Sequence, residues 1–175
     1  MEAAHAPVFT APRQRGLTLI ELLVVIVVAG ILMGWAVPGL QAMNARQEVV
    51  AEAHRLRMAL SLARNSAITR RSTVVVCPSP DRQRCHMDDW SASLVIVLGP
   101  LSGDDFAPDA LLRVLEGGRG VSVSYRQDGK PVRFTQLGRS SGHNGTFRIC
   151  GRHGQGAELV LSNFGRARAG NAIDC

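Results

Sequence analysis

Residues 15–40 read RGLTLIELLVVIVVAGILMGWAVPGL, and the segment 22–37 within them contains no charged side chain. With residues 17–21 added, the run is 21 residues long, which is enough for a helix to cross a bilayer. A secretory signal peptide would have a shorter apolar core with an Ala-x-Ala-like cleavage site after it, and no convincing site follows this run. The sequence therefore predicts a retained membrane helix, and the basic residues 13–15 predict that its start faces the cytoplasm.

Glu21 needs an explanation, because a charged side chain within lipid costs at least about 2.5 kcal/mol. One explanation is that its carboxylate lies at the membrane surface. The other starts from Gly16: if the chain is cut after this glycine, Leu17 gains a free amine one helical turn from Glu21. The amine and the carboxylate can then pair, within one chain or between neighbouring chains.

The stretch Arg15-Gly16 followed by LTLIEL resembles the class III signal of type IV pilins and type II secretion pseudopilins. The resemblance implies that prepilin peptidase cleaves after Gly16, that Leu17 is methylated, and that Glu21 helps the subunit dock with other pilins of the filament. Leu17 stands where these proteins usually have Phe. Pro38 falls at the position of their helix-kinking proline, which removes one helical hydrogen bond.

Residues 40–71 contain neither Pro nor Gly, and their apolar side chains recur at helical steps. The expected buried face consists of Ala42, Val49, Ala53, Leu56, Leu60, Ala63 and Ala67. The arginines of the other face are interpreted as solvent-exposed for the most part: Arg46, Arg55, Arg57, Arg64 and Arg70. We therefore expect one long, kinked helix, with a transmembrane half at 17–38 and an amphipathic half at 39–71, after a leader at 1–16.

Beyond Arg71 the apolar pattern changes to a period of two or to short runs, which is typical of strands. The expected strands are 73–77, 93–98, 111–115, 121–125, 132–135, 146–150 and 157–162. Asp128-Gly129 is a strong turn signal between the fourth and the fifth. The predicted fold is α+β: the long N-terminal helix packs on an antiparallel β-sheet domain, residues 72–175.

The four cysteines follow a membrane-targeting segment, which favours disulfides in an oxidising compartment. The expected pairs are Cys77 with Cys85 and Cys150 with Cys175. The alternative is a metal site that includes His86 or His153, but no CxxC or HxxxH spacing supports it. No Gly-x-Ser-x-Gly elbow, Walker loop or zinc-protease helix is present, so we expect no enzyme, no metal and no cofactor.

Positive charge gathers at the end of the chain, where residues 119–175 carry eight arginines and Lys130 against three acids. Arginine provides forked donors that suit phosphate or carboxylate. In Gly165-Arg166-Ala167-Arg168, an extended backbone would place the two guanidinium groups on one face, about 6–7 Å apart. Gly165 and Gly170 would let a polymer approach the backbone closely. Further candidates for the same surface are Arg133, Arg139, Arg148 and Arg152.

Three segments of the β region resemble the GspH/FimT subgroup of minor pilins: VCPS at 76–79 with Cys85, Trp90 before LVIV, and LSNFGR at 161–166. The GRxR sequence resembles the DNA-binding motif of FimT-type minor pilins. This resemblance implies an inner-membrane protein with a periplasmic domain that binds extracellular DNA through its phosphates during natural transformation. Phe164 is expected in the core rather than as a base-stacking residue. The alternative is a structural minor pilin or type II secretion pseudopilin of the FimU/GspH kind, which binds only protein partners.

Overall fold

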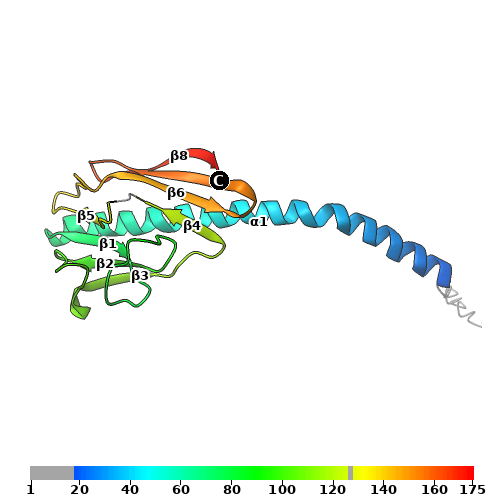
Figure 1. Ribbon diagram of the computed structural model, residues 1–175, viewed down its shortest axis with the longest axis horizontal. Coiled ribbons are helices and arrows are strands. Elements are labelled where there is room, and N and C mark those ends of the chain that lie inside the picture. The colour runs from blue at the N-terminus through cyan, green and yellow to red at the C-terminus, as the bar shows by residue number, and fades with distance from the viewer. Residues whose placement is uncertain (1–17, 126–127) are drawn as a thin grey trace, which may run out of the picture. The chain divides into compact units, whose positions relative to one another are not determined.

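The computed structural model describes residues 18–125 and 128–175, which form one long helix, two short 3₁₀ helices and eight strands (Figure 1). The elements are α1 (Leu19–Arg70), β1 (Val74–Pro78), β2 (Leu94–Leu98), η1 (Pro108–Ala110), β3 (Leu111–Leu115), β4 (Val121–Ser124), β5 (Val132–Phe134), β6 (Gly145–Gly151), η2 (Arg152–Gly154), β7 (Gln155–Leu161) and β8 (Ala167–Asp174). The chain divides into two compact units, Met1–Gly39 and Leu40–Cys175.

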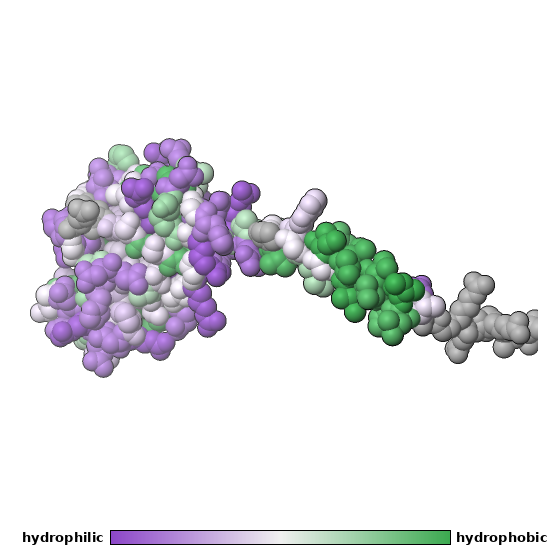
Figure 2. Space-filling view, turned by 45° about the vertical axis from the view of Figure 1, so that its right-hand side comes forward, coloured by the Kyte–Doolittle hydropathy of each residue, from purple (hydrophilic) through white to green (hydrophobic). Residues whose placement is uncertain are grey.

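The described part of the first unit is the start of α1, whose large apolar side chains are exposed. Figure 2 shows a green, hydrophobic surface along this segment. Among the described residues, α1 is the one helix that is long and apolar enough to cross a membrane. The helix begins next to Thr18, whose Oγ1 accepts a hydrogen bond from the backbone N–H of Glu21 (3.3 Å), as an N-cap side chain does.

In the second unit, the strands form two antiparallel sheets of four strands each. The order in the first sheet is β3-β2-β1-β5, and every residue of β1 is buried. A sheet covered on both faces reads as a continuous apolar run, which explains VVVC and LVIV. The order in the second sheet is β4-β6-β7-β8, and in β6 the buried Phe147 and Ile149 alternate with the exposed Thr146 and Arg148. One face of this sheet is therefore open to solvent.

The main core lies where the second half of α1 meets both sheets. Helix residues at steps of three and four, among them Val49, Leu56, Leu60, Ala63 and Ala67, are buried as expected. Trp90, Tyr125 and Phe147 pack together at its centre, with ring centroids 3.9–5.1 Å apart. The α+β prediction, with a long N-terminal helix packed on antiparallel β-structure, is confirmed. The kink at Pro38 stays a prediction.

Two details of the β region differ from the sequence prediction. The domain has two sheets, and the turn at Asp128-Gly129, where Gly129 has φ +64°, joins strands of different sheets. β4 pairs with β6, whereas β5 pairs with β1, and the inner faces of both sheets contribute to the core around α1. The second difference is β8, a strand of eight residues that the sequence pattern did not predict.

Candidate functional site: an arginine cluster at the turn before β8

The turn between β7 and β8 is a tight hairpin turn that exposes its tip. The N–H of Ser162 donates to the carbonyl of Arg166 (3.1 Å), and the N–H of Gly165 donates to the carbonyl of Ser162 (2.8 Å). Gly165 has φ +74°, in the left-handed region that glycine adopts at little cost. A three-residue hairpin loop that ends in a left-handed glycine is a common way to join two antiparallel strands.

This turn is fixed against the loop that follows β5. Ser140 donates from its N–H to the carbonyl of Asn163 (3.0 Å) and from its Oγ to the carbonyl of Ser162 (2.8 Å). Gly165 is buried, and a Cβ on it would overlap the carbonyl oxygen of Gly138. Gly165 therefore packs against protein, which differs from the expected close approach to a polymer. Gly170, by contrast, is exposed, although a Cβ on it would lie 2.7 Å from the Glu158 Cβ.

Three arginines from separate segments gather around the exposed ring of Phe164. The guanidinium of Arg139 lies over this ring, 5.6 Å from its centroid. Arg64 of α1 and Arg166 line a hollow of about 340 Å³ together with Phe164 and Ser162. The interpretation of Phe164 as a core residue is wrong, because its side chain is 68% exposed at the tip of the turn. With Arg168, these arginines are called the arginine cluster below.

Arg168 extends the cluster along the outer face of the second sheet. It is the second residue of β8 and lies opposite Val160 of β7, while the intervening Ala167 packs against the core. Arg166 and Arg168 thus flank an inward-facing residue, as the sequence analysis expected of an extended segment. Arg148 is on the same outer face but lies directly opposite Glu158, an acid within cross-strand reach.

The remaining two candidates lie elsewhere. Arg152 is at the β6–β7 turn, the opposite end of β7 from Arg166 and roughly 20 Å away. Its guanidinium pairs with the carboxylate of Glu48. Arg133 is in β5 of the first sheet, opposite Val75. The structure therefore does not bring Arg152 and Arg133 to the cluster.

The arginine cluster carries positive charge without acidic partners. None of the ion pairs in residues 18–125 and 128–175 includes Arg64, Arg139, Arg166 or Arg168. The Nε of Arg64 is buried and has no hydrogen-bond partner. The exposed arginines near the first disulfide differ, since Arg82 pairs with Glu116 (2.8 Å) and Arg84 with Asp105 (3.2 Å). Four guanidinium groups without counterions suit an anionic ligand.

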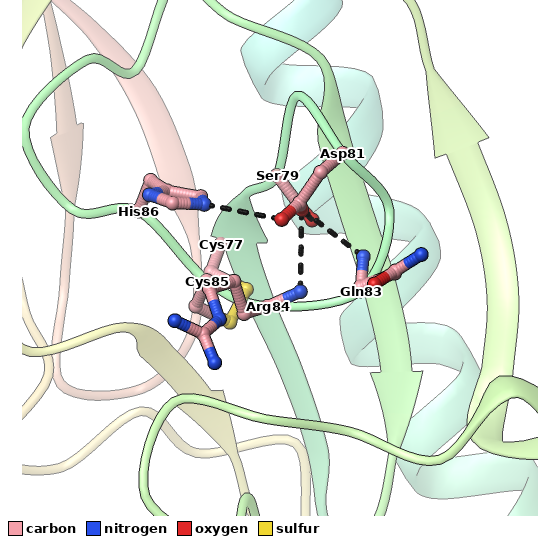
Figure 3. The surroundings of a disulfide bond; sticks show 7 residues. All are labelled: Cys77, Ser79, Asp81, Gln83, Arg84, Cys85 and His86. Carbon is pink, nitrogen blue, oxygen red and sulfur yellow. Dashed lines mark hydrogen bonds and ion pairs between the residues drawn. A yellow bond between two sulfur atoms is a disulfide. The ribbon is translucent and has the colours of Figure 1, made fainter.

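The structure contains the disulfides Cys77–Cys85 and Cys150–Cys175. Within the loop closed by the first, the carboxylate of Asp81 accepts hydrogen bonds from the N–H groups of Gln83 and Arg84 and from the Ser79 hydroxyl, and lies near His86 (Figure 3). These contacts, led by that from Gln83, hold the pKa of Asp81 well below its usual value. The described residues contain no group of three or more His, Cys, Asp or Glu that could hold a metal ion.

Glu52 and Arg55 form a buried ion pair that was not predicted from the sequence. Glu52 is 2% exposed, and the Arg55 Nε donates to its carboxylate at 2.9–3.1 Å. Arg55 also donates to the carbonyls of Trp90 (2.9 Å), Ala92 (3.1 Å) and Glu116 (3.2 Å). The interpretation of Arg55 as solvent-exposed is wrong, because these distant loops cover it. A clue in the sequence was that Glu52 falls on the apolar face of the helix, three residues before Arg55.

At the N-terminus, Gly16 and Leu17 lie outside the described residues. Glu21 is in the first turn of α1, where a carboxylate favours the positive end of the helix dipole. Thr18-x-x-Glu21 has the spacing of a capping box, a pattern that could have located the helix start.

Comparison with known proteins adds two sequence matches. Residues 52–165 match the family described as Type II transport protein GspH, and residues 11–37 match the prokaryotic N-terminal methylation motif. No curated protein gives a significant match to the chain.

The solved structures of one minor pilin share the fold. The type IV minor pilin FimU of Pseudomonas aeruginosa is 26% identical, with a TM-score of 0.59 over 74% of this chain and 96% of that one. A second crystal form of FimU gives 0.55 over 70% and 94%. The minor pseudopilin EpsH of Vibrio cholerae, 15% identical, gives 0.48 over 70% and 95%.

An N-terminal methylation motif joined to a domain with the fold of FimU defines a pilin-like protein. Within this class, the chain belongs to the GspH family.

Proposed function

We propose that the chain is a minor pilin that assembles into a pilus-type filament and binds DNA through the arginine cluster. The family and the likeness to FimU support the filament role, and the methylation motif supports processing by prepilin peptidase. In this proposal residues 17–38 hold the protein in the inner membrane, the domain lies in the periplasm, and Glu21 and Pro38 serve filament assembly.

If prepilin peptidase cleaves after Gly16, the wild type and a variant that resists cleavage should differ in mass. Wild-type protein extracted from membranes should lack residues 1–16 and carry a methyl group on Leu17. A Gly16→Val chain should keep its leader, because a side chain at this position blocks the cut. Intact-mass spectrometry distinguishes the two. A wild-type chain that retains residues 1–16 would contradict this step.

One observation carries the DNA proposal: the cluster's four arginines come from three segments and have no carboxylate partner among the described residues. Arginine contacts to phosphate do not depend on base sequence, and they release counterions when they form. The proposal is therefore binding to any DNA sequence, with an affinity that falls as salt rises. Copies repeated along a filament would add avidity.

The test compares the wild type with a double variant that carries both Arg166→Gln and Arg168→Gln. The full chain in detergent is titrated into labelled single-stranded and duplex DNA of mixed sequence, and binding is followed by fluorescence anisotropy. Loss of two charge-assisted contacts should weaken binding at least about tenfold. The matched control is the double variant Arg82→Gln, Arg84→Gln, which has the same spacing but removes arginines already paired with acids. Equal losses in both variants would contradict a specific site.

A purely structural role is the second candidate, and the match to a family described as a type II transport protein favours it. In that case the chain binds only other subunits of a pilus or pseudopilus. Deletion of the gene would then abolish piliation or secretion. Loss of DNA uptake alone, with filaments intact, favours the DNA role.

A further inference from the structure

The exposed ring of Phe164 is a feature that phosphate binding alone does not use. A phenylalanine at a hairpin tip gains little for folding when 68% of it stays in water. Its neighbours are cationic: Arg139 lies over the ring, and Arg64 and Arg166 share the hollow that the ring lines. An aromatic surface between arginines is the combination that proteins use to hold single strands, where bases stack while phosphates pair with the cations.

We infer that Phe164 is a stacking platform for an unpaired base, so that the arginine cluster takes single-stranded DNA in preference to duplex DNA. The inference rests on the proposed function, since the arginines supply the phosphate contacts. It adds the class of DNA and a specificity-determining residue.

The geometry favours stacking on one side of the ring over insertion into a duplex. A wedge side chain that kinks a duplex enters between two base pairs and needs both of its faces free. One face of the Phe164 ring is occupied by the guanidinium of Arg139 at 5.6 Å. The hollow that the ring lines with Arg64 and Arg166 offers space for a single base, whereas in a duplex the base faces are already stacked on each other.

The turn that carries the ring is fixed before any ligand binds. Hydrogen bonds from Gly165 to Ser162 and from Ser140 to Ser162 and Asn163 hold it, and the buried Gly165 packs against Gly138. Since the turn and the loop of Arg139 are joined in this way, stacking a base costs little ordering of the backbone. Arg64 lines the same hollow as the ring, so its guanidinium adds a further cation beside the stacking surface.

The test uses the full chain in detergent with three labelled probes: an oligothymidine, an abasic deoxyribose-phosphate oligomer of the same length, and a duplex. The abasic oligomer keeps the phosphates and lacks every base. The variants are Phe164→Leu, which keeps an apolar side chain but no aromatic face, and Phe164→Tyr, which keeps the ring. Leu137→Ala is the matched control, because Leu137 is also exposed, at 72%, in the neighbouring loop.

Phe164→Leu should weaken binding of oligothymidine about 5- to 100-fold and leave binding of the abasic oligomer and the duplex unchanged. Phe164→Tyr and Leu137→Ala should bind oligothymidine as the wild type does. Because Phe164 is exposed, Phe164→Leu should leave the fold intact, and near-ultraviolet circular dichroism of the aromatic core checks this.

The two proposals fail in different ways. Suppose that Phe164→Leu binds oligothymidine as tightly as the wild type, while the double variant Arg166→Gln, Arg168→Gln loses binding. The stacking inference is then overturned and the proposed function stands. Equal wild-type affinity for oligothymidine and the abasic oligomer would overturn it too. Binding to none of the three probes would overturn both.

Discussion

Arg55 and Arg166 lie in opposite environments although each begins an Arg-x-Arg sequence. Arg55 donates to the buried Glu52 carboxylate and to three backbone carbonyls, whereas Arg166 is exposed and has no acid partner among the described residues. The helical period predicted which face of α1 is buried. It could not predict the burial of Arg55, because the carbonyls that it binds lie 35 to 61 residues away in the sequence, and only the folded chain brings them to the helix.

The residue-scale prediction concerns this buried pair. Glu52→Gln keeps the shape of the side chain and leaves the charge of Arg55 uncompensated, so the free energy of unfolding should fall by about 3–5 kcal/mol. Urea denaturation followed by near-ultraviolet circular dichroism measures it. The control is Glu48→Gln, one turn earlier on the same helix, whose partner Arg152 is 62% exposed. That change should cost about 1 kcal/mol or less. Similar losses for both would show that burial does not govern the pair.

At the scale of elements, the strands with strong apolar patterns were predicted and β8 was not. Seven of the eight strands lie on the expected segments, because β-branched and apolar side chains mark them. β8 reads ARAGNAID, with alanines and glycine that have low strand propensity, and its pairing with β7 follows from the hairpin turn at Gly165. The partition into two sheets could not be predicted, since local patterns do not specify which strands pair.

The disulfide Cys150–Cys175 anchors the far end of β8. It joins the end of β6 to the residue after β8 and passes beside Gly156 of β7, where a Cβ would lie 2.5 Å from the Cys175 Sγ. No side chain other than hydrogen fits there without displacing the bridge.

The element-scale prediction is that Cys150→Ser with Cys175→Ser lowers the free energy of unfolding by about 2–4 kcal/mol. Because the bridge closes the edge strand onto the sheet, hydrogen exchange should increase mainly in β8, as measured by mass spectrometry of its peptides. Cys77→Ser with Cys85→Ser, the control, should leave exchange in β8 at the wild-type level. Unchanged exchange in β8 after loss of Cys150–Cys175 would contradict the anchoring role.

At the scale of the whole molecule, charge is divided between segments of the chain. Residues 72–118 carry seven acids and three arginines, whereas residues 119–175 have the excess of arginine. The arginine cluster thus forms in a part of the domain where few acids neutralise it. The excess of arginine is visible in the sequence, and Arg166, Arg168 and Arg139 are candidates that the sequence offers for a DNA-binding surface. The sequence did not predict Arg64 or the exposure of Phe164, which depend on how α1 and two loops meet.

The salt dependence of DNA binding tests the central claim most directly. Full-length wild type and the double variant Arg166→Gln, Arg168→Gln are titrated with duplex DNA across a range of salt concentrations. Each lost phosphate contact removes about 0.9 from the slope of log K against log salt, so the variant's slope should be shallower by about 1.8. The Arg82→Gln, Arg84→Gln control should keep the wild-type slope. The account would be contradicted if the wild type and the Arg166/Arg168 variant gave identical slopes. It would also be contradicted if the wild-type affinity did not depend on salt.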